Sequence, residues 1–161
     1  MNLHFTHEYW LNIVRQVAKA STCRVQLGCV LVKNNNIVGV GYTGSVSGDS
    51  HCEDVGCLLV NNYYMYGSDI MGKSCIRTVH AEMNALLKCT IQGSLKDGWL
   101  TCYSTYAPCL ACVKLLLQKG VRYFVYARIY KDDNRDYYLK MVHSNVQSQV
   151  VWTQYEENTC E

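Results

Sequence analysis

The stretch Gly98–Tyr126, GWLTCYSTYAPCLACVKLLLQKGVRYFVY, decides the fold of this chain. Its first part, Gly98–Ser104, and its last part, Val121–Tyr126, are rich in residues that favour β-strands. Between them, Pro108–Gln118 has the length and apolar spacing of a helix. A strand, a helix and a strand joined by short links predict a crossover unit between parallel strands.

Pro108 is the only proline of the chain and stands where this helix is expected to begin. At the first helical position its missing N–H costs nothing. Cys109 and Cys112 then fall in the first turn, and their spacing puts them on one face. The helix dipole favours the thiolate form there, which is the form that binds metals. The pair is therefore a candidate half of a metal site.

The rest of the chain extends this unit into a sheet covered by helices. Asn34-Asn35-Asn36 separates two β-rich runs and is a turn-prone hairpin tip. The helix that begins at His80 is expected to turn Met83, Leu86 and Leu87 inward. The further elements are a helix over Glu8–Ala20, strands over Val25–Val32 and Ile37–Tyr42, a helix over His80–Thr90, a helix over Asn134–His143 and a strand over Gln149–Thr153.

The element order αββαβαβαβ predicts a single domain over residues 1–161. An α/β chain of this order forms a three-layer α/β/α sandwich around a five-stranded mixed sheet. The Cys-rich stretch His51–Cys75 has no regular pattern. Within it, Asn61–Ser74 carries three tyrosines and two glycines and is expected to be an ordered surface insertion.

Composition narrows the class of protein. The chain has 161 residues, of which 49% are hydrophobic, so it can bury a sizeable core. Its formal net charge of +2 lacks the basic excess of proteins that bind long nucleic acids. Met1–Phe5 has no apolar signal-peptide core, and no apolar run is long enough to span a membrane. We therefore expect a cytoplasmic protein (in the host cytoplasm if a phage encodes it), whose ten cysteines bind metal or stay buried as thiols.

His80-Ala81-Glu82 supplies the other half of the candidate metal site. His80, Cys109 and Cys112 are three zinc ligands, and a catalytic zinc site keeps a fourth position open. Glu82 follows in the same first turn, where a carboxylate can take a proton from water and pass it to a substrate. The pattern H-x-E followed by P-C-x-x-C is the signature of zinc nucleobase deaminases, in which water replaces the ring amine and ammonia leaves.

Each run alone has a simpler explanation. A single His-x-Glu on a helix is most often a surface pair, and a single Cys-x-x-Cys is more often half of a structural zinc site or a redox pair. Here each run opens a predicted helix and a strand lies between them. The combination favours a catalytic zinc site of the deaminase type.

Most of residues 8–130 also resembles the deoxycytidylate (dCMP) deaminases of bacteria and phages, within the cytidine-deaminase-like superfamily. The resemblance implies a zinc hydrolase that converts dCMP to dUMP and ammonia, which feeds thymidylate synthesis. The residues that carry it are Ser21-Thr22-Cys23, Gly41-Tyr42-Thr43-Gly44-Ser45, His51-Cys52, Gly56-Cys57, Arg77–Ala85, Tyr103-Ser104-Thr105, Pro108-Cys109, Tyr126 and Tyr130.

The resemblance implies a substrate site as well. Tyr130 corresponds to a tyrosine near the substrate, and the backbone from Tyr103 to Ala107 lines the pocket for the base. The position of Thr43 usually carries an asparagine that contacts the sugar, and threonine is shorter and lacks the amide. The expected substrate-binding residues are Thr43, Ala81, Thr105, Ala107 and Tyr130, with Arg24, Arg77 and Lys114 either binding the phosphate or remaining solvated.

Members of this family are often hexamers that dCTP activates and that dTTP, with a divalent ion such as Mg²⁺, inhibits at a separate site. The resemblance therefore implies a homo-oligomer with nucleotide effectors. Glycine-rich backbone can approach phosphates closely, although an ordinary turn explains such a loop equally well. The candidate residues for this site are Gly41, Gly44, Ser45 and Gly48.

A second set of metal-type residues lies in and around the unassigned stretch. Related bacterial sequences carry Cys or His at similar places, and some members hold a second, structural zinc. Four protein ligands would close such a site, whereas buried free thiols are the alternative. The expected ligands are Cys23, Cys52, Cys57 and Cys75, with His51 as a substitute, while Cys29, Cys89 and Cys102 are expected in the core.

Other functions stay open from the sequence. A related deaminase could act on dCTP, on free cytidine or on a base in RNA, although the low charge favours a small nucleotide. A nucleotide-binding regulatory protein without turnover would have no need of Glu82. A purely structural zinc module would have four protein ligands rather than three.

Overall fold

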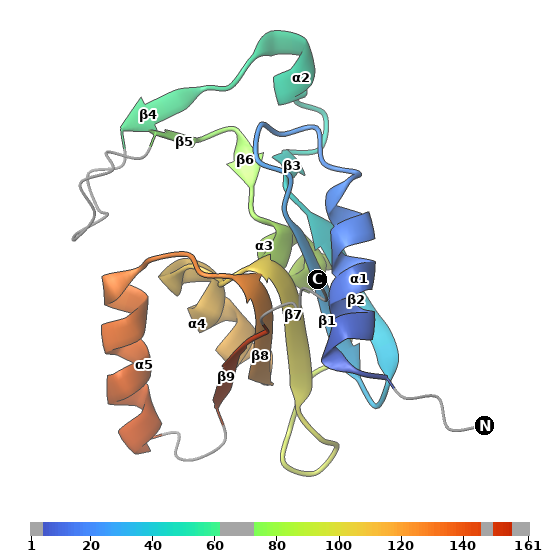
Figure 1. Ribbon diagram of the computed structural model, residues 1–161, viewed down its shortest axis with the longest axis vertical. Coiled ribbons are helices and arrows are strands. Elements are labelled where there is room, and N and C mark those ends of the chain that lie inside the picture. Colours follow the sequence, from blue (N-terminus) through green and yellow to red (C-terminus); the bar gives the residue numbers. More distant parts are fainter. Residues whose placement is uncertain (1–4, 62–72, 146–149, 156–161) are drawn as a thin grey trace, which may run out of the picture.

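A mixed five-stranded sheet forms the middle layer of the computed structural model, which describes residues 5–61, 73–145 and 150–155 (Figure 1). The strand order is β2-β1-β7-β8-β9, in which β2, β1 and β7 are antiparallel neighbours and β7, β8 and β9 are parallel. The strands are β1 (Gly28–Lys33), β2 (Asn36–Tyr42), β7 (Leu100–Tyr106), β8 (Val121–Arg128) and β9 (Val151–Gln154). The predicted crossover is confirmed, with α4 (Leu110–Gln118) between β7 and β8.

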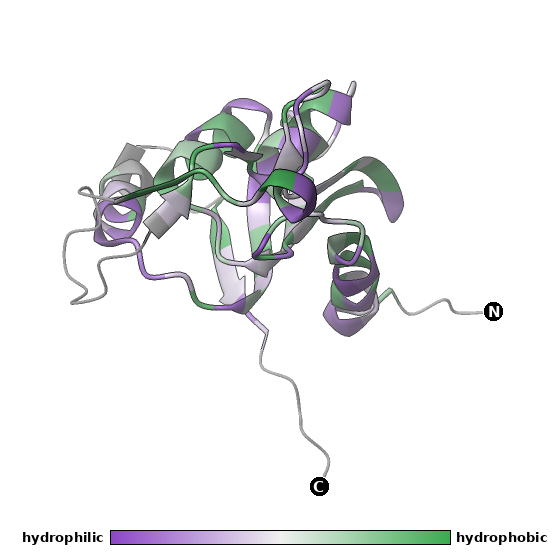
Figure 2. Cartoon of the chain, turned by 90° about the horizontal axis from the view of Figure 1, so that it is seen from above, coloured by the Kyte–Doolittle hydropathy of each residue, from purple (hydrophilic) through white to green (hydrophobic). Residues whose placement is uncertain are grey.

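Helices cover both faces of the sheet because successive strand residues point to opposite sides. Val30 in β1 packs in a cluster with α1 (His7–Ala18), while its neighbour Leu31 packs in a cluster with α3 (Ala81–Lys88) and α4. α5 (Asp133–Asn145) packs Leu139 against this second cluster. Seen from above, α1 carries both hydrophilic and hydrophobic residues, as a helix with one buried face does (Figure 2). The predicted three-layer α/β/α sandwich is confirmed.

A glycine in β2 lets α3 lie directly on the strand. A Cβ atom on Gly41 would collide with the backbone of Ala81 and Ala85 in α3. Both alanines are fully buried at this contact. Leu87 is 82% exposed, so the expectation that it faces inward is wrong. The helix buries its face of small residues against the strand, and this turns Leu87 to the outside.

The Cys-rich stretch forms short elements at the end of the sheet where β7 and β8 finish, at the top of Figure 1. β3 (Gly44–Ser45) pairs with β6 (Thr78–Val79), and β4 (Leu59–Asn61) pairs with β5 (Lys73–Cys75). α2 (Cys52–Val55) is a single turn. Most of the expected insertion Asn61–Ser74 lies outside the described residues. Within the described ranges, no helix has the length and apolar character needed to cross a bilayer.

Candidate active site

The structure brings His80, Cys109 and Cys112 together at the starts of two helices. The Nδ1 atom of His80 lies 3.5 Å from the Sγ atom of Cys109 and 3.4 Å from that of Cys112. His80 is the N-cap of α3, and Cys109 is the N-cap of α4. The expectation that Pro108 occupies the first helical position is therefore wrong. Cys109 keeps an extended backbone, and the helix begins only at Leu110.

The three side chains fit a zinc ion. Tetrahedral zinc, with Zn–S of about 2.3 Å and Zn–N of about 2.0–2.1 Å, separates its nitrogen and sulfur ligands by about 3.6 Å. The two separations between His80 and the cysteine sulfurs match this spacing. Two thiols and an imidazole are ligands that zinc prefers, and three protein ligands leave one coordination position for water or substrate.

Hydrogen bonding within the cluster shifts the pKa values of the three ligands in different directions. Hydrogen bonds from Cys112 and from His80 lower the pKa of the Cys109 thiol to about 4, although burial opposes this effect. Hydrogen bonding to Cys109 raises the pKa of His80, again against its burial. Hydrogen bonding to Cys109, together with burial, raises the pKa of Cys112. Of the two cysteines, Cys109 therefore gives up its proton more readily, and the thiolate is the metal-binding form.

Glu82 reaches the same site from the first turn of α3. The residue is only 8% exposed, and its Oε2 atom accepts a hydrogen bond from the Cys112 thiol at 3.7 Å. Burial raises the pKa of its carboxyl group, although the backbone N–H of Glu82 and the charge of His80 act in the opposite direction. A buried carboxyl group with a raised pKa is suited to accepting and releasing a proton.

A cavity of about 290 Å³ opens beside this cluster, and His80, Glu82 and Cys109 line it. Of the residues singled out for substrate binding, four line the cavity: Arg24, Thr43, Ala107 and Tyr130. The sequence did not single out Val25, Leu27, Ser74 and Thr78 for this role, and they line it too. Tyr106 also lines it and belongs to the segment Tyr103–Ala107 that was expected around the base; it ends a strand of the crossover unit, where sites of α/β proteins gather.

Ala81, Thr105, Arg77 and Lys114 were also expected at the substrate, and they are not among the described residues that line the cavity. Ala81 is fully buried. The Thr105 hydroxyl accepts a hydrogen bond from the β1 backbone at 3.2 Å. Thr43 borders the cavity, yet its hydroxyl donates to the Val25 carbonyl at 2.9 Å and accepts from the Leu27 N–H at 3.1 Å. These two bonds brace the segment that leads into β1.

Three of the four cysteines expected at a second metal site form a cluster. The sulfur atoms of Cys52, Cys57 and Cys75, here called the peripheral thiol cluster, lie within 4.8 Å of one another, and those of Cys52 and Cys75 are 3.7 Å apart. Two sulfurs on one tetrahedral zinc lie about 3.8 Å apart. The cluster therefore has the spacing of a thiolate zinc site.

Hydrogen bonding gives two thiols of this cluster, Cys52 and Cys75, different pKa values. Burial, helped by the hydrogen bond with Cys75, raises the pKa of Cys52 to about 12. Burial opposes ionisation of Cys75 as well, but hydrogen bonds from Thr78, from the Arg77 backbone and from Cys52 bring its pKa down to about 7. Cys75 is thus the thiol of this pair that gives up its proton more readily.

Cys23 and His51 lie outside the peripheral thiol cluster. The Cys23 sulfur lies 3.3 Å from the Thr78 hydroxyl oxygen, and the Nδ1 atom of His51 lies 3.1 Å from the Thr22 hydroxyl oxygen. Cys23 is still close enough to contribute to the raised pKa of Cys52, after burial and the hydrogen bond with Cys75. Of the two, Cys23 therefore lies electrostatically within reach of the cluster.

The loop at 41–48 has a closed part and an open part. α3 covers Gly41, whereas a Cβ atom on Gly44 or Gly48 would meet no described atom within 4 Å. The Ser45 hydroxyl donates to the backbone carbonyl of Ser50, just after this loop, at 2.8 Å. Arg77 forms an ion pair of 2.7 Å with Asp49, the residue that follows the loop. The structure thus separates Gly41 from the glycines that solvent reaches.

The amino-acid sequence of this chain is similar to those of known deaminases. Residues 5–128 match the family model of the cytidine and deoxycytidylate deaminase zinc-binding region. ComE operon protein 2 of Bacillus subtilis (strain 168) is 36% identical over 126 residues, which are 78% of this chain and 60% of that protein. The deoxycytidylate deaminase of Mycobacterium phage D29 is 33% identical over 122 residues, which are 75% of this chain and 93% of that enzyme.

The fold has a solved counterpart. The dCMP deaminase of the cyanophage S-TIM5, crystallised in complex with dCMP and dUMP, superimposes with a TM-score of 0.66 at 21% identity, over 92% of this chain and 95% of that one. The chain spans less than two thirds of ComE operon protein 2 and most of the D29 enzyme. The family model covers His80, Glu82, Cys109 and Cys112 together. The chain therefore belongs to the cytidine and deoxycytidylate deaminase zinc-binding family.

Proposed function

We propose that this chain, acting as one domain, catalyses the zinc-dependent hydrolysis of dCMP to dUMP and ammonia. The observation that carries the proposal is the buried Glu82 carboxyl group, which accepts a hydrogen bond from Cys112 and lines one cavity with His80 and Cys109. The choice of substrate is supported by relatives named deoxycytidylate deaminase, among them the phage D29 enzyme.

In this proposal His80, Cys109 and Cys112 hold the metal and Glu82 moves the proton. When bound, the zinc ion supplies the Lewis acid that makes water a nucleophile near neutral pH. Glu82 takes one proton from the attacking water at Oε2 and passes it to N3 of the pyrimidine ring, and it then carries the second proton of that water to the exocyclic amine. The C4–N bond then breaks, and the amine leaves as ammonia. The raised pKa of Glu82 makes both directions of this transfer accessible.

The cavity wall would orient the pyrimidine and exclude water. Ala107 and Tyr106 border the metal side, and burial raises the pKa of Tyr130, so its phenol stays neutral and can donate a hydrogen bond. Thr43 would shape the wall beside the sugar without offering its hydroxyl, because backbone groups already occupy it.

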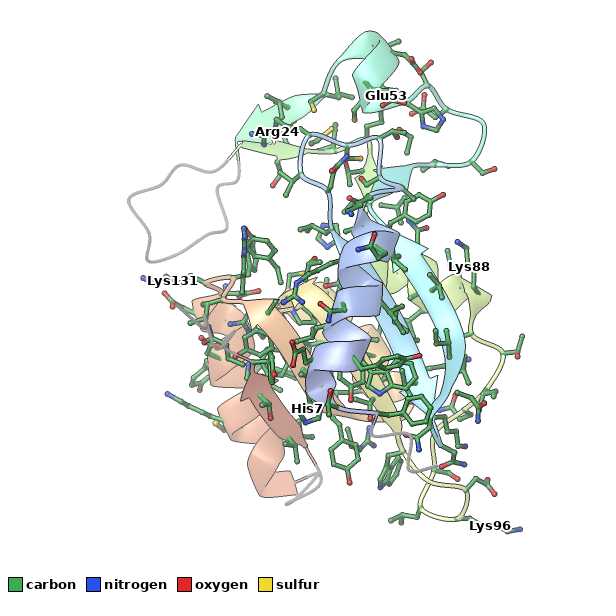
Figure 3. The ribbon with its side chains drawn as sticks, turned by 45° about the vertical axis from the view of Figure 1, so that its right-hand side comes forward. His7, Arg24, Glu53, Lys88, Lys96 and Lys131 are labelled. Carbon is green, nitrogen blue, oxygen red and sulfur yellow. The ribbon has the colours of Figure 1, made fainter. Side chains whose placement is uncertain are left out.

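Arg24 is our candidate for the phosphate of the nucleotide. It lines the cavity, and Figure 3 shows it beside the β4–β5 pair, at the end of the molecule that holds the site. Arginine suits phosphate because its planar guanidinium donates two parallel hydrogen bonds. Arg24→Ala should raise KM for dCMP by about tenfold, the value of one charge-assisted hydrogen bond, and leave KM for deoxycytidine unchanged. An equal change for both substrates would remove Arg24 from phosphate recognition.

We also propose that the peripheral thiol cluster holds a second, structural zinc, with Cys23 as the fourth ligand and His51 as its substitute. The 3.7 Å separation of the Cys52 and Cys75 sulfurs supports it. Metal analysis of the purified protein should give two zinc ions per chain. One ion per chain would leave the cluster as free thiols.

The proposed function includes an oligomeric state and nucleotide effectors. We propose a cytoplasmic homohexamer that dCTP activates and that dTTP with Mg²⁺ inhibits, with the open part of the 41–48 loop near the effector. The exposure of Gly44 and Gly48 supports this place. A dTTP titration with Mg²⁺ should lower the rate of deamination, and an unchanged rate would remove the effector.

Ammonia release from a panel of substrates tests the reaction itself. The zinc-loaded protein should release ammonia from dCMP much faster than from dCTP, cytidine or tRNA. A preference for dCTP or cytidine would move the assignment to a related deaminase. Release from none of them, with dCMP still binding, would favour a regulatory nucleotide-binding protein.

A further inference from the structure

The loop between β8 and α5 reaches back to the metal-binding end of α4. Cys109, the N-cap of α4, makes no capping hydrogen bond with its side chain in the described structure. A metal ligand cannot serve as a normal cap, because its sulfur is committed to the ion and is a weak acceptor. The N–H of Leu110, the first of α4, therefore needs an acceptor from elsewhere.

Asp132 supplies this acceptor from 22 residues further along the chain. Its Oδ2 atom accepts the N–H of Leu110, the first residue of α4, at 2.8 Å. Its Oδ1 atom accepts the N–H of Arg135 at 2.9 Å, which caps α5. One carboxylate thus caps two helices, and the cap of α4 acts on the residue next to Cys109.

Arg135 fastens the same loop from inside the protein. It is only 3% exposed, although it carries a full charge. Its guanidinium donates to the carbonyl of Pro108 at 3.2 Å and to the carbonyl of Tyr130 at 2.7 Å. It also forms an ion pair with Asp136 at 2.8 Å and lies over the Trp152 ring of β9 at 5.2 Å.

These contacts connect the residue before a metal ligand with a residue that lines the cavity. Pro108 directly precedes the ligand Cys109, and both Cys109 and Tyr130 line the cavity. Burying an arginine costs free energy unless its donors are satisfied, so a buried arginine with this set of acceptors holds them at fixed distances. Neither Asp132 nor Arg135 is among the described residues that line the cavity. Lys131, labelled in Figure 3, marks where this loop enters α5.

We propose that Asp132 and Arg135 are positioning residues that set the sulfur of Cys109 and the ring of Tyr130 around the cavity. The proposal rests on the proposed function for its consequence in catalysis, but its first effect is on metal binding. Groups that orient metal ligands typically change metal affinity by about 10- to 100-fold when they are replaced.

The test reads zinc occupancy at Cys109 directly. Zinc-loaded protein is held at one free zinc concentration and alkylated with iodoacetamide, and peptide mass spectrometry gives the rate at Cys109. Asp132→Asn keeps the size of the side chain and removes one of its two acceptor oxygens. We expect Cys109 to be alkylated about tenfold faster than in the wild type, the lower end of the range for such groups. Cys75 should be unchanged in the same digest.

Two further variants separate the mechanism from general destabilisation. Asp133→Asn removes the same charge one residue away, on an exposed position, and should alkylate like the wild type. Arg135→Lys keeps the charge but cannot hold both carbonyls, so Cys109 alkylation should rise and KM for dCMP should rise with it. Thermal unfolding of each variant identifies any that fail to fold, and these are excluded from the comparison.

Wild-type alkylation rates at Cys109 in both folded Asp132→Asn and Arg135→Lys would overturn the proposal. An equal increase in Asp133→Asn would also overturn it, since charge alone would then be the cause. The alkylation needs no substrate. If the zinc-loaded wild type releases no ammonia from dCMP, that result contradicts the proposed function and leaves the positioning role to be judged by alkylation.

Discussion

The two groups of metal-type side chains in this chain are held in place by different parts of the fold. His80, Cys109 and Cys112 sit at the starts of two helices that pack on the central sheet, and Cys112 is fully buried. The peripheral thiol cluster sits on a single helical turn, on the irregular segment after it and on one short strand, beyond the end of that sheet. The first site is formed by the core, whereas the second joins elements too short to be stable alone. A metal at the first site would therefore serve chemistry, whereas a metal at the second would serve folding.

The largest expected effect comes from removing a ligand of the first site. Cys112→Ala should abolish ammonia release from dCMP and reduce the zinc content by one ion per chain, while the sheet stays folded. Circular dichroism, metal analysis and the ammonia assay measure the three quantities. Cys89→Ala is the matched control, because Cys89 is a buried cysteine of the same core whose thiol donates only to the Ile91 carbonyl. Retained turnover in Cys112→Ala would contradict the assignment.

The packing of α3 on β2, which positions the first site, can be disrupted without replacing a metal ligand. Gly41→Ala puts a methyl group against the backbone of α3, which carries His80 at its start, and such overpacking should cost about 3 kcal/mol of unfolding free energy. Gly44→Ala, in the open part of the same loop, should stay within about 0.5 kcal/mol of the wild type. Urea unfolding measures both. Equal effects would mean that α3 does not depend on this contact.

Loss of a ligand at the second site should lower the stability of the chain rather than its turnover. Cys57→Ser should lose one zinc ion and destabilise the chain by about 2 kcal/mol, which is about 4–8 °C in melting temperature for a chain of this size. Turnover at low temperature should remain, since Cys57 is no ligand of the first site. A complete loss of turnover at a normal melting temperature would instead give this cluster a part in the chemistry.

The sequence predicts the central layer well because the signals there are local. Alternating β-rich runs place the strands, and Asn34 and Asn35 adopt positive φ angles of 50° and 59° at the expected hairpin tip. The fixed spacing of Cys109 and Cys112 brings both to one helix start. The expected helix start at Pro108 is two residues too early, because Cys109 itself takes the cap position and the helix begins at Leu110.

What the sequence does not predict depends on contacts between distant segments. Nothing near Asp132 indicates that its carboxylate caps a helix 22 residues earlier. The residues around Cys57 have no period because α2, β4 and β5 are too short to show one. The place of Cys23 beside Thr78 is likewise a contact across 55 residues that no local pattern indicates.

Ammonia release by the Glu82→Gln variant tests most directly whether the first site carries the chemistry. The amide keeps the shape of the side chain but cannot take a proton, so ammonia release from dCMP should fall by about 10³-fold while both zinc ions stay bound. Glu8→Gln, at an exposed position of α1, is the control and should keep full activity. Wild-type turnover in Glu82→Gln would contradict the proposed mechanism.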